Sequence, residues 1–113
     1  SSMGDGINRV LTIILAMLNA RDGILLIDEF ENGLHYSVQQ KLWKVIFSLS
    51  KSLNIQVFVT THSRDAIRAF AAENKENDGV FIRLERRKDK VITISYDDKE
   101  DLDLVLEQDI EIR

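Results

Sequence analysis

An apolar run that ends in two carboxylates most constrains the fold of this 113-residue chain. Residues 24–27 read Ile-Leu-Leu-Ile and are followed directly by Asp28 and Glu29. An apolar run without polar alternation is typical of a strand buried on both faces of a parallel sheet. Ligands of open parallel sheets bind outside the carboxyl ends of the strands. The run therefore predicts a central parallel strand that delivers two acids to a site, although a strand can also end in surface acids without function.

Three helices and a second strand are predicted around this strand. Residues 7–20 carry apolar side chains at positions 7, 10, 11, 14, 15 and 18, which predicts a mostly buried helix. Residues 37–53 have the pattern of an amphipathic helix. Trp43, Phe47 and the preceding Tyr36 are expected to be its packing residues. Residues 56–60 read as a second buried strand, and Ser63 is a favourable N-cap for a helix to about residue 72. This order predicts a parallel βαβ unit.

The last third of the chain has a different pattern. Residues 80–85 and 91–96 alternate around a polar turn, which predicts a β-hairpin, and residues 102–106 have helical spacing. The basic residues of this hairpin either contact nucleic acid or prevent its edges from pairing with other strands, and we favour the second interpretation. Helical spacing puts the acids of residues 97–103 on different sides of a short solvated helix, which favours a solvated surface over a metal cluster. One domain, 1–113, is expected, with a core at 1–73 and the hairpin and helix at 80–113.

Composition narrows the classes of protein that fit. The net charge of −4 does not indicate a protein that coats nucleic acid or an anionic membrane. There is no cysteine, so disulfides and thiolate metal sites are excluded. The longest apolar stretch, residues 10–18, is too short to span a bilayer, and residues 1–9 do not resemble a signal peptide. We expect a cytoplasmic protein.

The second strand also ends in residues suited to a site. It is followed by Thr60, Thr61, His62 and Ser63, so His62 should emerge at the same sheet edge as Asp28 and Glu29. Parallel strands lie roughly 5 Å apart, which places an imidazole within reach of a phosphate bound there. A histidine after a strand is alone more often a surface or capping residue. Two such strand ends in one βαβ unit favour a site.

These motifs together resemble those of ABC-type ATPases. Residues 24–29 look like a Walker B motif, residues 31–35 sit where that family carries its D-loop, and residues 60–63 look like its switch-histidine motif. Residues 2–9 are similar to the ABC signature segment. The combination, with the closing residues 109–113, resembles most the OLD-like and AAA-type ABC ATPases. The implied fold class is α/β, a partial P-loop NTPase fold with a parallel βαβ core.

The resemblance implies a role for each motif residue. Asp28 would hold Mg²⁺, Glu29 would act as general base, and His62 would sense the γ-phosphate of ATP. The D-loop, with Asn32 and Gly33, would cross a dimer interface. The signature segment, with Gly4, Asp5 and Gly6, would touch the nucleotide of the partner subunit. The cofactors implied are ATP and Mg²⁺, and the partners are a second copy or the missing N-terminal half of the ATPase domain.

The chain departs from the family pattern in two places. The signature serine has no clear counterpart, because Met3 or Gly4 occupies its position, although backbone amides of residues 4–6 at a helix N-terminus can still bind phosphate. No G-x-x-x-x-G-K-[ST] run occurs in the sequence. We therefore expect a P-loop to precede Ser1 in a longer protein, and little ATP binding by this chain alone. A non-catalytic module that docks onto a complete ATPase, or part of a DNA repair or phage-defence ATPase, are alternatives.

Overall fold

The computed structural model describes residues 2–76 and 78–96. The chain divides into two units, residues 1–73 and residues 74–113, and each is described by itself. The elements of the first unit, in chain order, are α1 (Ser2–Asn19), β1 (Ile24–Ile27), α2 (Tyr36–Ser52), β2 (Gln56–Val59) and α3 (Arg64–Glu73). The predicted order of helices and strands is confirmed for this unit.

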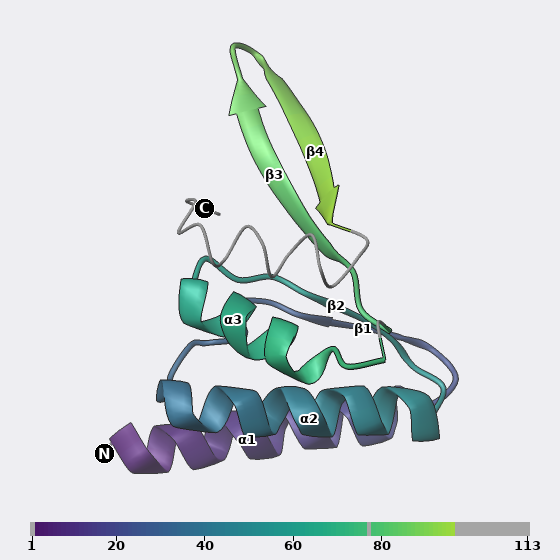
Figure 1. Ribbon diagram of the computed structural model, residues 1–113. Coiled ribbons are helices and arrows are strands. Elements are labelled where there is room, and N and C mark those ends of the chain that lie inside the picture. The colour runs from purple at the N-terminus through teal and green to yellow at the C-terminus, as the bar shows by residue number, and fades with distance from the viewer. Residues whose placement is uncertain (1, 77, 97–113) are drawn as a thin grey trace. The chain divides into compact units, whose positions relative to one another are not determined.

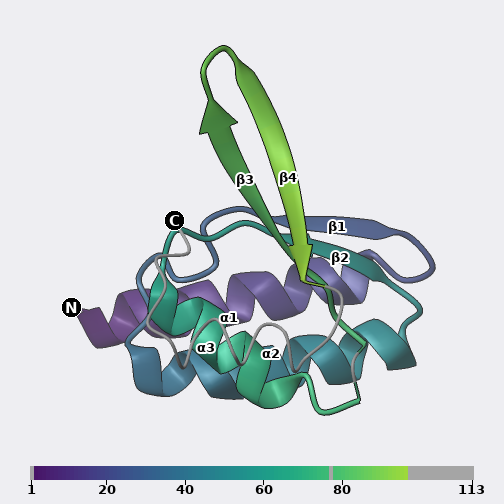
Figure 2. The same cartoon turned by 45° about the horizontal axis from the view of Figure 1, so that its top comes forward.

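The two strands of the first unit form a parallel pair. Ile24 lies opposite Gln56 and Ile27 opposite Val59, so both strands end at the same edge. The pairing continues through backbone hydrogen bonds on either side, from Gln56 N to Gly23 O (3.0 Å) and from Thr60 N to Ile27 O (2.9 Å). The three helices all lie on one side of the pair (Figures 1 and 2). The βαβ unit predicted from the sequence is confirmed.

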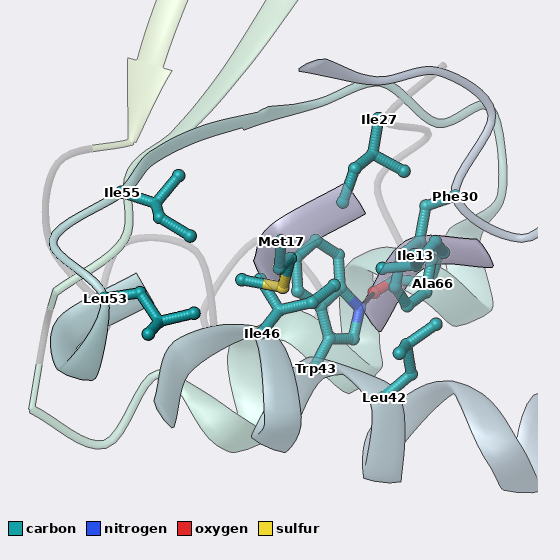
Figure 3. Packing of buried hydrophobic residues seen from close by; sticks show 10 residues of the cluster. All are labelled: Ile13, Met17, Ile27, Phe30, Leu42, Trp43, Ile46, Leu53, Ile55 and Ala66. Atoms are coloured by element: carbon teal, nitrogen blue, oxygen red, sulfur yellow. Dashed lines mark hydrogen bonds between the residues drawn. The ribbon is translucent and has the colours of Figure 1, made fainter. Parts of the chain in front are cut away.

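The core lies between the sheet and the helices (Figure 3). Trp43 of α2 is at its centre, where its ring stacks on Phe30 with centroids 4.2 Å apart and meets Phe70 edge-on at 5.1 Å. The indole N–H of Trp43 donates to the carbonyl of Ala66 in α3 at 3.0 Å. Ten buried residues make up the cluster: Ile13, Met17, Ile27, Phe30, Leu42, Trp43, Ile46, Leu53, Ile55 and Ala66.

Helix α1 differs from its prediction in its start and in its buried face. It begins at Ser2 rather than at residue 7. Its buried side chains are Ile13 and Met17, whereas four side chains of the predicted face are more than half exposed. These four are Ile7 (54%), Leu11 (52%), Leu15 (58%) and Leu18 (53%). Helix α1 therefore has two apolar faces. The rest of the first unit covers the face with Ile13 and Met17, not the predicted face.

The prediction that β1 is buried on both faces is wrong for this unit. Ile27 is buried, but Ile24 and Leu26 are 69% and 65% exposed, and Phe58 of β2 is 50% exposed on the same face. The physical reason is that the helices cover one face of the sheet only (Figure 2). Parallel sheets are normally covered on both faces. The outer faces of the sheet and of α1 thus leave apolar surface exposed.

Polar side chains set the starts of α2 and α3. The imidazole of His35 accepts a hydrogen bond from the Ser37 amide at 3.2 Å and caps α2. The hydroxyl of Ser63 accepts from the Ala66 amide at 3.2 Å, which confirms the predicted N-cap of α3. Tyr36, which was expected to pack, is 65% exposed and lies beside the His35 ring instead. His35 is therefore an exposed capping residue.

The second unit contains the predicted hairpin. β3 (Phe81–Arg87) pairs antiparallel with β4 (Lys90–Tyr96), and Arg87 lies opposite Lys90 across a two-residue turn. Before the hairpin, the Asn74 side chain closes a loop by bonding both the amide and the carbonyl of Gly79 at 2.9 Å. The predicted short helix and the acids of residues 97–103 lie outside the described residues. No described helix has the length and apolar character needed to cross a membrane.

Candidate active site

The ends of β1 and β2 are joined through the hydroxyl of Thr60. The register that pairs Ile27 with Val59 brings Asp28 level with Thr60. The Thr60 hydroxyl donates to a carboxylate oxygen of Asp28 and accepts from the Glu29 amide at 2.8 Å. The Phe30 amide donates to the Thr60 carbonyl at 3.0 Å. The two acids that end β1 are thereby fixed to the start of the loop that carries His62.

The chain turns sharply after β1. Glu29 has φ +50° and Gly33 has φ +75°, so both lie in the left-handed region. The Asn32 amide donates to the Glu29 carbonyl and the Leu34 amide to the Glu31 carbonyl, both at 2.9 Å. Left-handed geometry is unfavourable for a glutamate, and such positions concentrate at functional sites. The turn leaves the Glu29 side chain exposed beyond the sheet edge.

Arg9 of α1 holds the same turn from a second side. Its guanidinium nitrogen Nη2 donates to the carbonyl of Asp28 at 2.7 Å and to that of Glu29 at 3.0 Å. One cation thus satisfies two successive carbonyls where the strand ladder has ended. Arg9 is a site residue that the sequence prediction did not single out.

Replacing Arg9 with Met is expected to lower the free energy of unfolding by about 1–2 kcal/mol, because two charge-assisted hydrogen bonds at a partly exposed position are lost. Urea unfolding followed by the fluorescence of Trp43 measures this change. Arg21→Met, at an exposed turn position, is the control and should unfold at the wild-type urea concentration. Equal unfolding midpoints for the two variants would contradict a holding role for Arg9.

The loop that carries His62 is bound to the turn by Glu31. One carboxylate oxygen of Glu31 accepts from the Thr61 hydroxyl at 2.5 Å, and the other accepts from the His62 amide at 3.2 Å. The His62 side chain is exposed. Segments 28–35 and 60–63 therefore lie side by side, as the strand order predicted. The backbone of His62, rather than its side chain, is held by this contact.

The segment resembling an ABC signature lies against the turn at Gly33. A methyl group added at Gly6 would stand 3.3 Å from the Gly33 carbonyl, and one added at Gly33 would stand 4.0 Å from the Asp5 carbonyl. Gly4, Asp5 and Gly6 are part of α1 rather than a loop before it. The two segments expected to bind nucleotide, residues 4–6 and residues 32–33, thus lie against each other. Their role toward a nucleotide remains a prediction.

The donor set fits Mg²⁺ bound mainly by substrate and water rather than by a protein cage. Among the described residues no group of three or more acidic, histidine or cysteine side chains could hold a metal ion. Asp28 is exposed and uses one carboxylate oxygen for Thr60, which leaves the other available. Mg²⁺ in nucleotide sites is held by one or two carboxylates with phosphates and waters. Asp28 suits that arrangement.

The basic hairpin residues are partly engaged within the hairpin. The Glu85 carboxylate pairs with Arg83 at 3.4 Å and with Arg87 at 3.3 Å. These pairs lie within β3, and the interpretation that the hairpin charges block edge pairing stays a prediction.

Comparisons with known proteins identify an ATPase family for the greater part of the chain. Residues 1–67 match the family model described as AAA ATPase domain. The chain is 37% identical over 81 residues to an ATP/GTP phosphatase of Helicobacter pylori, a match that covers 69% of this chain and 22% of that protein. It is 35% identical over 82 residues to an uncharacterized protein of Methanocaldococcus jannaschii, covering 73% of this chain and 71% of that protein. No solved structure matches. The chain thus spans about a fifth of the first relative.

Proposed function

Because the chain belongs to the AAA ATPase domain family, we propose that it supplies the Walker B strand, the D-loop and the switch histidine of a site that binds and hydrolyses ATP. The finer assignment is to the ABC-type, OLD-like branch, in which two such sites form around nucleotide in a dimer. A segment with a P-loop completes the site. The H. pylori relative, named as an ATP/GTP phosphatase, supports the reaction class.

One observation carries this proposal. The hydroxyl of Thr60 joins Asp28 and the amide of Glu29, so the two acids and the loop leading to His62 share one sheet edge. Hydrolysis of a phosphoanhydride requires a metal-binding carboxylate, a group that takes a proton from water, and a polar contact to the γ-phosphate. The first unit offers one residue of each kind at this edge.

The residues divide the chemistry as follows. Asp28 would hold Mg²⁺, and that ion would supply positive charge against the phosphate oxygens. Glu29, raised beyond the strand end by its left-handed backbone, accepts a proton from the attacking water. His62 donates a hydrogen bond to the γ-phosphate. Asn32 and Gly33 lie in the D-loop, and residues 4–6 lie in the first turns of α1, on the side of a nucleotide held by a partner.

The exposed apolar surface supports completion by another α/β segment. The outer stripe of α1 and the outer face of β1 and β2 present seven side chains that are at least half exposed: Ile7, Leu11, Leu15, Leu18, Ile24, Leu26 and Phe58. Apolar faces of a helix and of a parallel sheet that are both exposed are typical of surfaces that a larger domain buries. We assign this surface to the half of the ATPase domain that carries the P-loop.

Titration of Mg-ATP tests the proposal. The 113-residue chain alone is expected to bind weakly, since its sequence contains no P-loop lysine or glycine cradle. The same chain joined to the upstream part of its reading frame is expected to bind ATP and to hydrolyse it. Tight binding by the chain alone would contradict the assignment of a missing P-loop segment.

A second candidate is a non-catalytic module that docks onto a complete ATPase. It is favoured by one observation: the M. jannaschii relative is itself short, because 82 aligned residues make up 71% of it. Under this alternative the extended reading frame shows neither ATP binding nor hydrolysis, and the apolar surface binds a separate ATPase chain. The same titration therefore distinguishes the two candidates.

A further inference from the structure

We propose that Glu31 is a positioning residue that couples the D-loop turn, residues 31–35, to the switch loop, residues 60–63. Its significance for hydrolysis rests on the proposed function of His62. In this proposal a displacement of the turn is transmitted to the backbone of residue 62 through the Glu31 carboxylate. Glu31 acts through the switch loop and not on the attacking water or the nucleotide.

The carboxylate of Glu31 is used at both oxygens. Oε1 accepts from the Thr61 hydroxyl at 2.5 Å, and Oε2 accepts from the His62 amide at 3.2 Å. Glu31 is partly buried, so water competes less for these bonds than at a fully exposed position. Two neighbouring groups of the switch loop are thus held by one rigid, planar acceptor.

The contact extends into helix α3. The Thr61 hydroxyl that donates to Glu31 also accepts from the Ser63 amide at 3.0 Å. Ser63 in turn caps α3 by accepting from the Ala66 amide. A continuous series of hydrogen bonds therefore runs from Glu31 to the first turn of α3.

On its other side Glu31 is part of the turn itself. Its carbonyl accepts from the Leu34 amide, which closes the turn around Gly33. The Leu34 carbonyl accepts from the side chain of Gln39, a buried residue of α2. The turn is thus anchored at both ends, and the Gly33 carbonyl faces the first turns of α1. A displacement of Gly33 by α1 would therefore reach Glu31 in two ways: along the backbone of residues 31–33 and through the hydrogen bond from the Leu34 amide to the Glu31 carbonyl.

The chemistry of the carboxylate predicts a graded series of variants. Glu31→Ala removes both acceptors. Glu31→Asp is one methylene shorter and cannot reach both donors from the same backbone. Glu31→Gln can accept from His62 N through its oxygen and donate to Thr61 through its nitrogen, because a threonine hydroxyl both donates and accepts. Coupling should therefore be lost with Ala, weakened with Asp and largely kept with Gln.

Amide exchange in the nucleotide-free 113-residue chain tests the proposal. Glu31→Ala is expected to speed hydrogen exchange at the His62 amide by roughly tenfold to a hundredfold, as expected for one hydrogen bond to a charged acceptor. Glu31→Gln should restore most of the protection. Glu73→Ala is the matched control, because it removes a carboxylate that accepts from Gln40 at 3.0 Å elsewhere in the unit. Unchanged exchange at His62 in Glu31→Ala would overturn the proposal.

A double-substitution experiment separates coupling from a merely structural role. Gly33→Ala is expected to shift the backbone amide resonances of residues 61–63 in the wild-type background and to leave them unshifted when Glu31 is Ala. Asn32→Ala serves the same purpose if the strained Gly33 variant does not fold. Equal shifts in both backgrounds would show that Glu31 does not transmit the change. Because no nucleotide is present, this result is independent of whether the ATPase proposal succeeds.

Discussion

Glu29→Gln is expected to slow ATP hydrolysis by roughly 10²–10⁴-fold in the protein that includes the P-loop segment, as is typical for loss of a general base. Glutamine keeps the size and polarity of the side chain but cannot accept the proton of the attacking water. The backbone bonds of Glu29 to Thr60 and Arg9 do not involve its carboxylate and should persist. Phosphate release under single-turnover conditions measures the rate, and ATP affinity should remain near that of the wild type.

Glu73→Gln is the control for this experiment. Glu73 ends α3, and its carboxylate accepts a hydrogen bond from the side chain of Gln40. Its replacement should leave the hydrolysis rate unchanged. If Glu29→Gln hydrolysed ATP at the wild-type rate, the assignment of the general base would be wrong. If Glu29→Gln lost ATP binding as well, Glu29 would contribute to binding of the ATP ground state and not only to proton transfer.

The elements around the site could be predicted from local sequence alone. Residues 24–27 and 57–59 are apolar, rich in isoleucine and valine, and sharply bounded, and both runs lie in strands of the structure. Ser63 was expected to cap a helix, and its hydroxyl does so. These features depend on residues close in the chain, where periodicity and capping chemistry decide the conformation.

The buried face of α1 could not be predicted in the same way. Its sequence has apolar residues on two stripes, one with Ile13 and Met17 and the other with Leu11 and Leu15. Periodicity identifies both but does not show which the rest of the chain covers. The choice is made by α2 and β1, against which α1 packs. The same limit applies to β1, whose apolar outer face is exposed in this unit.

The bonds that hold the site were missed because they join residues distant in sequence. Arg9 reaches residues 28 and 29, and Glu31 reaches residues 61 and 62. No local pattern distinguishes these two charged residues from their neighbours. Thr60 is different, since aligning two parallel strands by their apolar runs places it opposite Asp28. Thr60 was named in the switch-histidine motif, and this register was a usable signal for its contact with Asp28.

Trp43→Ala is expected to lower the free energy of unfolding by about 3–5 kcal/mol, the usual cost of removing a large buried aromatic side chain. The substitution leaves a cavity between Phe30 and Phe70. It also removes the hydrogen bond that ties α2 to the Ala66 carbonyl (Figure 3). Phe30 follows the site acids directly in sequence, so the core under the site loses its main support. Because Trp43 is the only tryptophan, urea unfolding should be followed by far-UV circular dichroism.

One further variant separates the aromatic ring of Trp43 from its N–H group, and a second is a surface control. Trp43→Phe keeps an aromatic contact with Phe30 and should cost less than Trp43→Ala, since part of the cavity is filled. Tyr36→Ala removes an exposed aromatic ring from the same helix and should change stability by less than about 0.5 kcal/mol. If Trp43→Ala lost no more stability than Tyr36→Ala, the contacts of Trp43 would not be what holds α2 and α3 together. Some other contact would then have to fix the switch loop, which leads into α3.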